Sequence, residues 1–140
     1  MMTSAEFRCH REALGVPVEW LAWHMSVTPR SVHRWEADET HPIPEYFADM
    51  LRKLVAATDR YVQALARNAG EVPVIGTYRS SADIPRVDGG ERVIFPASWH
   101  RAATLRAARH HGAMIYYRDA DHSTIDDAAQ WAITQGWVAH

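Results

Sequence analysis

The sequence predicts a mainly α-helical protein, with an N-terminal five-helix domain over residues 1–70 and a small α+β domain over residues 71–140. Two observations predict this division. Apolar residues recur at helical spacing up to residue 70, whereas short strand-like runs and turn residues alternate with helical segments after it. A chain of 140 residues, 47% of them hydrophobic, is also long enough to bury the cores of two small domains.

Two short helices are expected at the N-terminus. The first covers residues 3–14, with Ser4 as its N-cap and Gly15 as a left-handed C-terminal stop. The second has Pro17 in its first turn, where the missing N–H is not needed, and it ends near Met25.

A third short helix is expected after a tight turn. Thr28 is placed to cap it, Pro29 suits its first position, and Ala37 marks its end. The apolar residues of the second and third helices fall on one side of each helix, so the two are expected to pack together across the turn. The inward-facing residues of this pair are Leu21, Ala22, Val27, Val32 and Trp35.

A longer helix is expected from about residue 44 to Asn68. Its apolar positions repeat every four and three residues, which is typical of a heptad seam. These positions are Phe47, Leu51, Leu54, Thr58, Tyr61, Leu65 and Asn68. The helix would be roughly 37 Å long at about 1.5 Å per residue, so its C-terminal part could pair with a second copy or pack on the second domain. A break between residues 56 and 58, giving two shorter helices, is equally compatible with the pattern.

The second half of the chain alternates short strands with helices. Strands are expected at 72–78, 92–95 and 113–117, helices at 97–110 and 125–134, and a short helical turn between Ser80, its cap, and Ile84. This pattern predicts a small α+β domain.

The charge pattern favours a local basic face. The net charge of −2 counts against a protein coated in basic residues. However, the 16 residues from Trp20 to Trp35 contain no acidic residue, and the acids begin again at Glu36. The third helix presents four polar residues outward within this window, namely Arg30, Ser31, His33 and Arg34. The guanidinium fork of arginine matches the O6 and N7 atoms of guanine in the major groove, although exposed helices also carry arginine for solubility alone.

A wider pattern links residues 7–54 to a known family. It consists of Arg8, Arg11-Glu12-Ala13-Leu14-Gly15, Leu21-Ala22, Val27-Thr28, Ser31-Val32-His33-Arg34-Trp35-Glu36 and Pro44. In these residues the chain resembles the helix-turn-helix family of the phage lambda Cro and cI repressors and the XRE-like regulators. The resemblance implies a lambda-repressor-like fold, a third helix in the major groove, and a homodimer on an inverted repeat.

The resemblance also assigns roles to residues. It implies that Thr28 contacts phosphate and that Arg30, Ser31 and Arg34 read bases, and we add His33 as a base reader. Arg8 and Arg11 are expected as further phosphate contacts.

Two positions depart from the family pattern. Ser26 stands where the turn usually has glycine, which predicts a strained or altered turn. Pro17-Val18 replaces the polar residue that usually begins the second helix and touches phosphate, so one contact is expected to be lost.

A looser pattern covers most of the chain. It comprises Ile43-Pro44-Glu45, Pro73, Tyr78-Arg79-Ser80, Asp83 and Trp99. It resembles the small regulators associated with anti-CRISPR operons. That resemblance implies autorepression by homodimers that are joined through the C-terminal part.

Other kinds of function have little support in the sequence. The nine histidines show no metal-ligand spacing, and Cys9 is the only cysteine, so no metal site, cofactor or internal disulfide is expected. Asp126-Asp127 and the neighbours Ser98 and His100 do not form a catalytic pattern, so no enzyme is expected. With no signal-peptide core and no apolar run long enough to span a bilayer, the chain is expected to be cytoplasmic and not membrane-bound.

The sequence therefore predicts a cytoplasmic transcriptional repressor that binds double-stranded operator DNA as a homodimer. The alternative is an antitoxin-like interaction module, in which the second half neutralises a partner protein and DNA binding is lost. The near-neutral charge and the missing phosphate contact favour this alternative, whereas Arg30 and Arg34 favour DNA.

Overall fold

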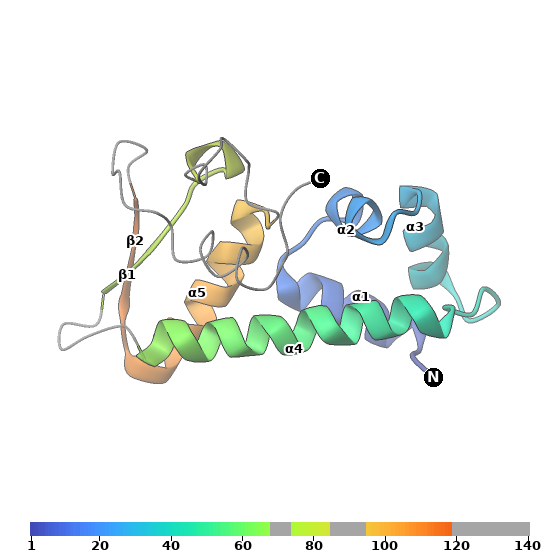
Figure 1. Cartoon of the computed structure of the whole chain (residues 1–140), viewed down its shortest axis with the longest axis horizontal. Helices are drawn as coiled ribbons and strands as arrows, with labels where there is room; N and C mark the ends of the chain where they lie inside the picture. The colour runs from blue at the N-terminus through green and yellow to red at the C-terminus, as the bar shows by residue number, and fades with distance from the viewer. Residues whose placement is uncertain (68–73, 85–94, 119–140) are drawn as a thin grey trace. The chain divides into compact units, whose positions relative to one another are not determined.

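The computed structural model of the chain describes residues 1–67, 74–84 and 95–118 (Figure 1). Within these residues the protein is mainly helical, with one small sheet of two parallel strands, as the sequence predicts. None of the described helices combines the length and the apolar character needed to cross a membrane. The elements are α1 (Ser4–Leu14), α2 (Val18–Met25), α3 (Pro29–Ala37), α4 (Glu45–Arg67), β1 (Val74–Thr77), a 3-10 turn (Ser81–Asp83), α5 (Ala97–His111) and β2 (Met114–Tyr117).

The chain divides into two compact units, residues 1–59 and residues 60–140. The division falls inside α4, earlier in the chain than the domain boundary expected after residue 70. The helix therefore contributes its N-terminal part to the first unit and its last turns to the second.

The N-terminal caps of the first two helices differ from the predictions. Thr3, and not Ser4, caps α1, because its hydroxyl oxygen accepts a hydrogen bond from the N–H of Glu6 (3.0 Å). Pro17 lies at the N-cap position of α2 with an extended backbone, so the helix begins one residue later, at Val18. The stop at Gly15 is confirmed, with a left-handed φ of 72°.

The first 67 residues form four helices, and the prediction of five in this part is wrong. The helix α4 is unbroken from Glu45 to Arg67, because no glycine or proline interrupts it. At the expected break, the Thr58 hydroxyl donates a hydrogen bond to the carbonyl oxygen of Leu54 (2.8 Å). This polar group is therefore buried without losing a hydrogen-bond partner.

The heptad seam of α4 is largely buried within the single chain. Leu51, Leu54, Thr58 and Tyr61 are all buried, and they form the continuous centre of the seam. An apolar surface that the chain already covers is not free to pair with a second copy, so the structure does not favour a dimer through this seam.

The second unit contains a strand–helix–strand arrangement. β1 and β2 are parallel neighbours, with Val74 opposite Met114 and Thr77 opposite Tyr117, and α5 connects them and packs on the sheet. The apolar side of α5, with Trp99, Ala103 and Ala107, is buried, and Trp99 stacks on Phe95 with ring centroids 3.9 Å apart. The helical turn after Ser80 is confirmed, since Ser80 and Asp83 form a capping box. The predicted helix 125–134 and most of the predicted strand 92–95 lie outside the described residues.

Candidate nucleic-acid interface

The turn between α2 and α3 is short and contains no glycine (Figure 1). Ser26 adopts a left-handed backbone with φ 57° and ψ 41°, the one positive φ of a non-glycine residue among the described residues. Its N–H donates to the carbonyl oxygen of Trp23 (3.1 Å), and the N–H of Val27 donates to that of Ala22 (2.9 Å). These bonds end α2 as a glycine would, so the expected strain is present at Ser26 but the turn remains tight.

The start of α3 is capped as predicted. The Thr28 hydroxyl oxygen accepts a hydrogen bond from the N–H of Ser31 (3.2 Å), and it also lies 3.1 Å from the Ser31 hydroxyl oxygen. Pro29 occupies the first helical position, where it needs no hydrogen-bond partner. The Thr28 side chain is exposed, so it combines the cap with access to solvent.

Two apolar side chains anchor α3 to the first unit. Val32 and Trp35 are buried, and α3 packs against both α1 and α2. The Trp35 ring contacts Phe7 of α1 edge-on with centroids 5.8 Å apart, and it lies 5.0 Å from the ring of Phe47 of α4. Contacts on two sides fix the rotation of α3 about its axis, and therefore decide which residues face outward.

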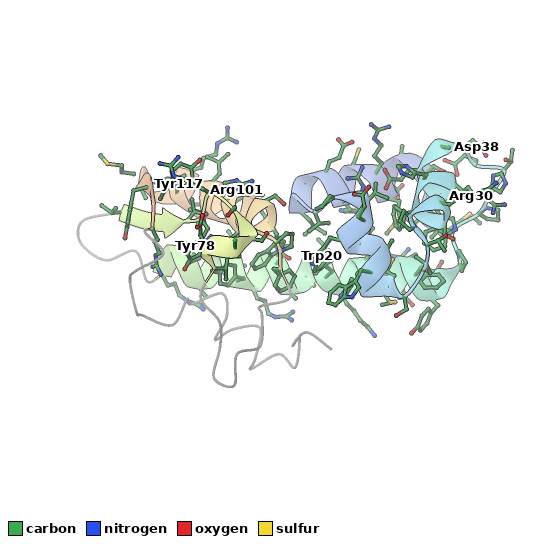
Figure 2. All side chains as sticks on the ribbon, turned by 90° about the horizontal axis from the view of Figure 1, so that it is seen from above. Trp20, Arg30, Asp38, Tyr78, Arg101 and Tyr117 are labelled. Carbon is green, nitrogen blue, oxygen red and sulfur yellow. The ribbon has the colours of Figure 1, made fainter. Side chains whose placement is uncertain are left out.

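The opposite face of α3 carries the predicted base readers. Arg30, His33 and Arg34 are exposed, and Ser31 is half-buried beside Thr28. Arg30 extends from the surface of α3 in Figure 2. Among the residues that the structure describes, no acidic side chain forms an ion pair with Arg30 or Arg34. The structure therefore brings the two arginines together with Ser31 and His33 on one outward helix.

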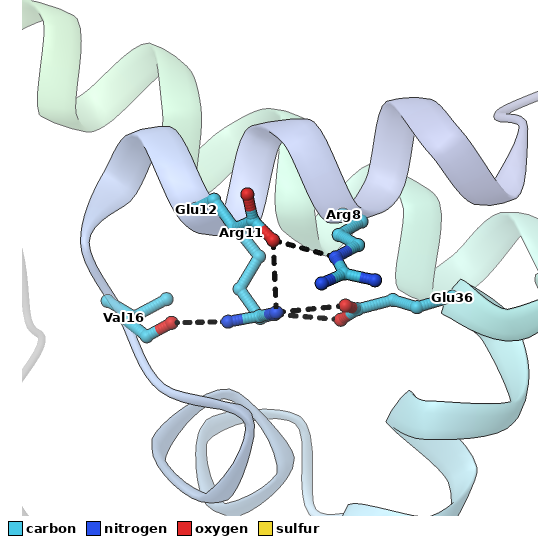
Figure 3. Close-up of polar contacts among 5 residues, drawn as sticks. All are labelled: Arg8, Arg11, Glu12, Val16 and Glu36. Carbon is cyan, nitrogen blue, oxygen red and sulfur yellow. Dashed lines mark hydrogen bonds and ion pairs between the residues drawn. The ribbon is translucent and has the colours of Figure 1, made fainter.

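Arg11, predicted to contact phosphate, instead holds the frame of this unit together (Figure 3). Its Nε donates to Glu36 Oε2 (2.7 Å) and its Nη2 to Glu36 Oε1 (2.9 Å), while its Nη1 donates to the Val16 carbonyl oxygen (3.1 Å). The side chains of Arg11 and Glu36 are only 13% and 7% exposed. The hydrogen bonds to Glu36 raise the pKa of Arg11 above its ordinary value.

This Arg11–Glu36 clamp joins three parts of the unit. Arg11 comes from the last turn of α1, Val16 from the link to α2, and Glu36 from the last turn of α3. We assign Arg11 a structural role, because each of its three guanidinium nitrogens donates a hydrogen bond to a partner within the chain. The sequence indicated only that Glu36 ends the acid-free window, and nothing in its spacing from Arg11 showed that the two pair.

The remaining acids near the end of α3 also have partners within the chain. The N–H of Ser4 donates to Glu39 Oε1 (3.0 Å), and the Ser4 hydroxyl donates to the carbonyl oxygen of Asp38 (2.9 Å). Hydrogen bonds from the side chain and backbone of Thr40 lower the pKa of Asp38. The negative charges at this end of α3 are thus used to hold α1 and the following loop.

Arg8, the other predicted phosphate contact, lies on α1 and is exposed. Its Nε donates to Glu12 Oε1 (2.7 Å), one helical turn further along, and both side chains are more than half exposed. The hydrogen bond from Arg8 lowers the pKa of Glu12. Such an exposed pair is weak and can exchange partners.

His100 has a structural environment and not that of a reactive base. It is buried, and its Nε2 lies 3.0 Å from the Tyr61 hydroxyl while its Nδ1 lies 2.8 Å from the Thr77 hydroxyl and 3.3 Å from that of Thr104. Burial lowers its pKa to about 4, and the positive charges of Arg118 and Arg101 act in the same direction. A neutral imidazole enclosed by hydroxyl groups holds β1, α4 and α5 together.

Comparison with known proteins does not assign the chain to a family. No protein-family model matches this chain, and no curated protein matches it. The function is therefore inferred from the residues and contacts described above.

Proposed function

We propose that this chain is a sequence-specific DNA-binding transcriptional repressor that reads the major groove with α3. The observation that carries this proposal is the charge arrangement of α3. Arg30 and Arg34 face outward with no ion-pair partner among the described residues, while Glu36 and Glu39 bond to α1. A helix that is anchored by buried side chains, exposes two arginines and pairs its one acidic residue within the chain is suited to the phosphate-lined groove of DNA.

Each outward residue has a distinct role in this proposal. Arg30 and Arg34 lie one helical turn apart and would each bind a guanine edge, and Ser31 and His33 would add hydrogen bonds to neighbouring bases. Thr28 and Arg8 would contact phosphate, the latter by exchanging Glu12 for a phosphate oxygen. Arg11 is no longer among the proposed contacts.

The proposed unit of action is a homodimer. The pair α2–α3 would act as a helix-turn-helix of the Cro and cI type, with each α3 in one half of an inverted repeat, about one turn of DNA (roughly 34 Å) from its twin. Bound over a promoter in the cytoplasm, and most simply over its own promoter, the dimer would exclude RNA polymerase.

The test is binding of the full chain to the DNA upstream of its own gene over a series of salt concentrations. Binding should weaken steeply with salt, because each neutralised phosphate contributes about 0.9 to the slope of log K against log salt. Arg34→Ala should lose about 1–3 kcal/mol of specific binding and relax the preference at one base pair.

A matched control separates base reading from simple loss of charge. Arg52 is an exposed arginine of α4 that bonds to Glu45 and Asp49, so Arg52→Ala changes the net charge equally without touching α3. Equal effects of the two substitutions would remove Arg34 from the readers, and no binding at low salt would refute the repressor.

A second candidate is a protein-interaction module of the antitoxin type. It is favoured by the net charge of −2 and by the exposed ring of Trp23 on α2. Binding to a partner protein that does not weaken with salt, together with absence of DNA binding, would support this candidate over the repressor.

A further inference from the structure

The second unit gathers two arginines at the carboxyl ends of its parallel strands. The Nη1 atom of Arg101, early in α5, donates hydrogen bonds to the carbonyl oxygens of Tyr78 (2.9 Å) and Arg79 (2.7 Å), the two residues that follow β1. The guanidinium carbon of Arg79 lies 4.2 Å from the centre of the Tyr117 ring, at the end of β2. Arg101 and Tyr117 can be followed in Figure 2. Two guanidinium groups therefore belong to one corner of this unit.

Each of these guanidinium groups is held by the fold and still has donors to offer. Both hydrogen bonds of the half-buried Arg101 come from Nη1, so among the described residues its Nε and Nη2 atoms have no hydrogen-bond partner. Arg79 is exposed, and its contact with the Tyr117 ring positions the guanidinium without using any of its N–H donors in a hydrogen bond to an oxygen of the described residues. The corner thus presents two positioned sets of donors.

No described carboxylate neutralises this pair. Asp83 is the one acidic residue among the described residues of the second unit. Its Oδ2 accepts hydrogen bonds from the N–H (3.1 Å) and the hydroxyl (3.2 Å) of Ser80. Within the described part of the chain it forms no ion pair with Arg79 or Arg101. Two like charges that the fold brings to one corner repel one another, so an anion there would be attracted.

The surroundings add to the positive potential of the corner. The N–H of Ala97, at the start of α5, donates to the Ser81 hydroxyl (3.0 Å), so the positive end of the helix dipole lies beside the turn that follows β1. Burial is the main cause of the low pKa of His100, and the charges of Arg118 and Arg101 lower that pKa further. In open sheets of parallel strands, ligands bind beyond the carboxyl ends of the strands.

We propose that Arg79 and Arg101 form a binding site for the phosphate monoester of a small organic molecule. Guanidinium groups bind phosphate oxygens through charge-assisted hydrogen bonds. A monoester has three terminal oxygens and close to two negative charges near neutral pH, so it can accept hydrogen bonds from both arginines at once. Ile115 and Tyr117 lie on one side of the sheet and are 37% and 45% exposed, so they offer apolar surface to the organic part of the ester.

This inference concerns the second unit alone and does not depend on DNA binding. Its test is a titration of the full chain followed by ¹H–¹⁵N NMR, with phenyl phosphate as the probe. The amide signals of Arg79, Arg101 and Tyr117 should shift saturably, and inorganic phosphate should compete. Methyl phenyl phosphate, a diester with a single charge like the phosphates of nucleic acid, should bind about tenfold more weakly or worse, because it loses a charge and an accepting oxygen.

Four variants test the assignment of the residues. Arg79→Met should weaken binding of phenyl phosphate by about tenfold or more, and Arg101→Lys, which keeps the charge but not the fork, should weaken it also. Tyr117→Leu leaves every charge in place and removes the ring that positions Arg79, so it should weaken binding by a smaller factor. The matched control is Arg109→Met, at an exposed arginine roughly 12 Å further along α5, and it should leave binding unchanged.

The other outcomes overturn the site. Equal losses for Arg79→Met and Arg109→Met would mean attraction to net charge alone. Equal binding of the monoester and the diester would point to a nucleic-acid backbone as the ligand, and saturable shifts at Arg30 and Arg34 instead would place the anion on α3. A chain that binds phenyl phosphate in this corner but binds no DNA would support the site and refute the repressor. A chain that binds its operator but no monoester would refute the site alone.

Discussion

The Arg11–Glu36 clamp makes a prediction that separates a structural arginine from a DNA contact. The perturbation is Arg11→Met, which keeps much of the aliphatic volume and removes the guanidinium that joins α1 to α3. Glu36, only 7% exposed, would then lose both hydrogen bonds to its carboxylate, and the exposed Arg8 would be a positive charge near it that makes no hydrogen bond to it. Glu36→Leu makes the reciprocal change and leaves the Arg11 charge without its partner.

The expected magnitude follows from burial. Removing one partner of a fully buried pair costs about 3–5 kcal/mol, whereas replacing both by apolar residues is often close to neutral. Because Arg11 is still 13% exposed, we expect the lower end, about 3 kcal/mol, for either single substitution. The double variant should lose much less than the sum of the two, with a coupling of about 2–3 kcal/mol.

The assay is urea unfolding followed by far-ultraviolet circular dichroism. With a denaturant slope of roughly 2 kcal/mol per molar, each single variant should shift the midpoint by roughly 1.5 M. Arg8→Met is the matched control on the same helix, and it should change the midpoint little because the Arg8–Glu12 pair is exposed. The reasoning is refuted if Arg11→Met leaves stability unchanged but lowers both DNA affinity and its salt dependence.

Two further predictions concern the turn and the buried histidine. Ser26→Gly should stabilise the chain by about 0.5–1 kcal/mol, because glycine adopts the left-handed backbone at lower cost, and Ser26→Ala should show no gain in the same thermal unfolding measurement. Because the pKa of His100 is lowered to about 4, the unfolded chain takes up its proton first as pH falls. Stability should therefore decrease from about pH 6.5 downward, by about 2 kcal/mol at pH 5 and until about pH 4. His100→Gln should flatten this part of the curve, and an unchanged slope in that variant would count against the buried neutral imidazole.

The helices of the first unit were predictable because their signals are local. Gly15 stops α1, Thr28 and Pro29 start α3, and the spacing of Val32 and Trp35 selects the buried side of α3. Each of these preferences acts within a few residues, so it can be read without knowing what lies across the core.

The wrong predictions concern residues whose partners are distant in the sequence, where local preferences do not decide the contact. Ser4 is a good capping residue by type, but its hydroxyl and N–H bond to Asp38 and Glu39, more than 30 residues away. Arginine is a residue type that often contacts phosphate, which led to the prediction for Arg11. Only the folded chain places Glu36 beside it. For α4, the apolar pattern allowed both one helix and two, and the structure has one unbroken helix whose seam is largely buried.

The sequence by itself determined that the chain is mainly helical and that α3 carries Arg30, Ser31, His33 and Arg34 on its polar side, since helical periodicity assigns residues to faces. The tertiary structure decided which charged side chains pair within the chain and which remain exposed for contact with a ligand. Ion pairing depends on distance in space, and the fold brings the acids of the α3 end to α1 while it leaves the arginines of α3 facing outward. It also decided that the apolar strand β2 is exposed, because exposure depends on what the fold packs against the strand.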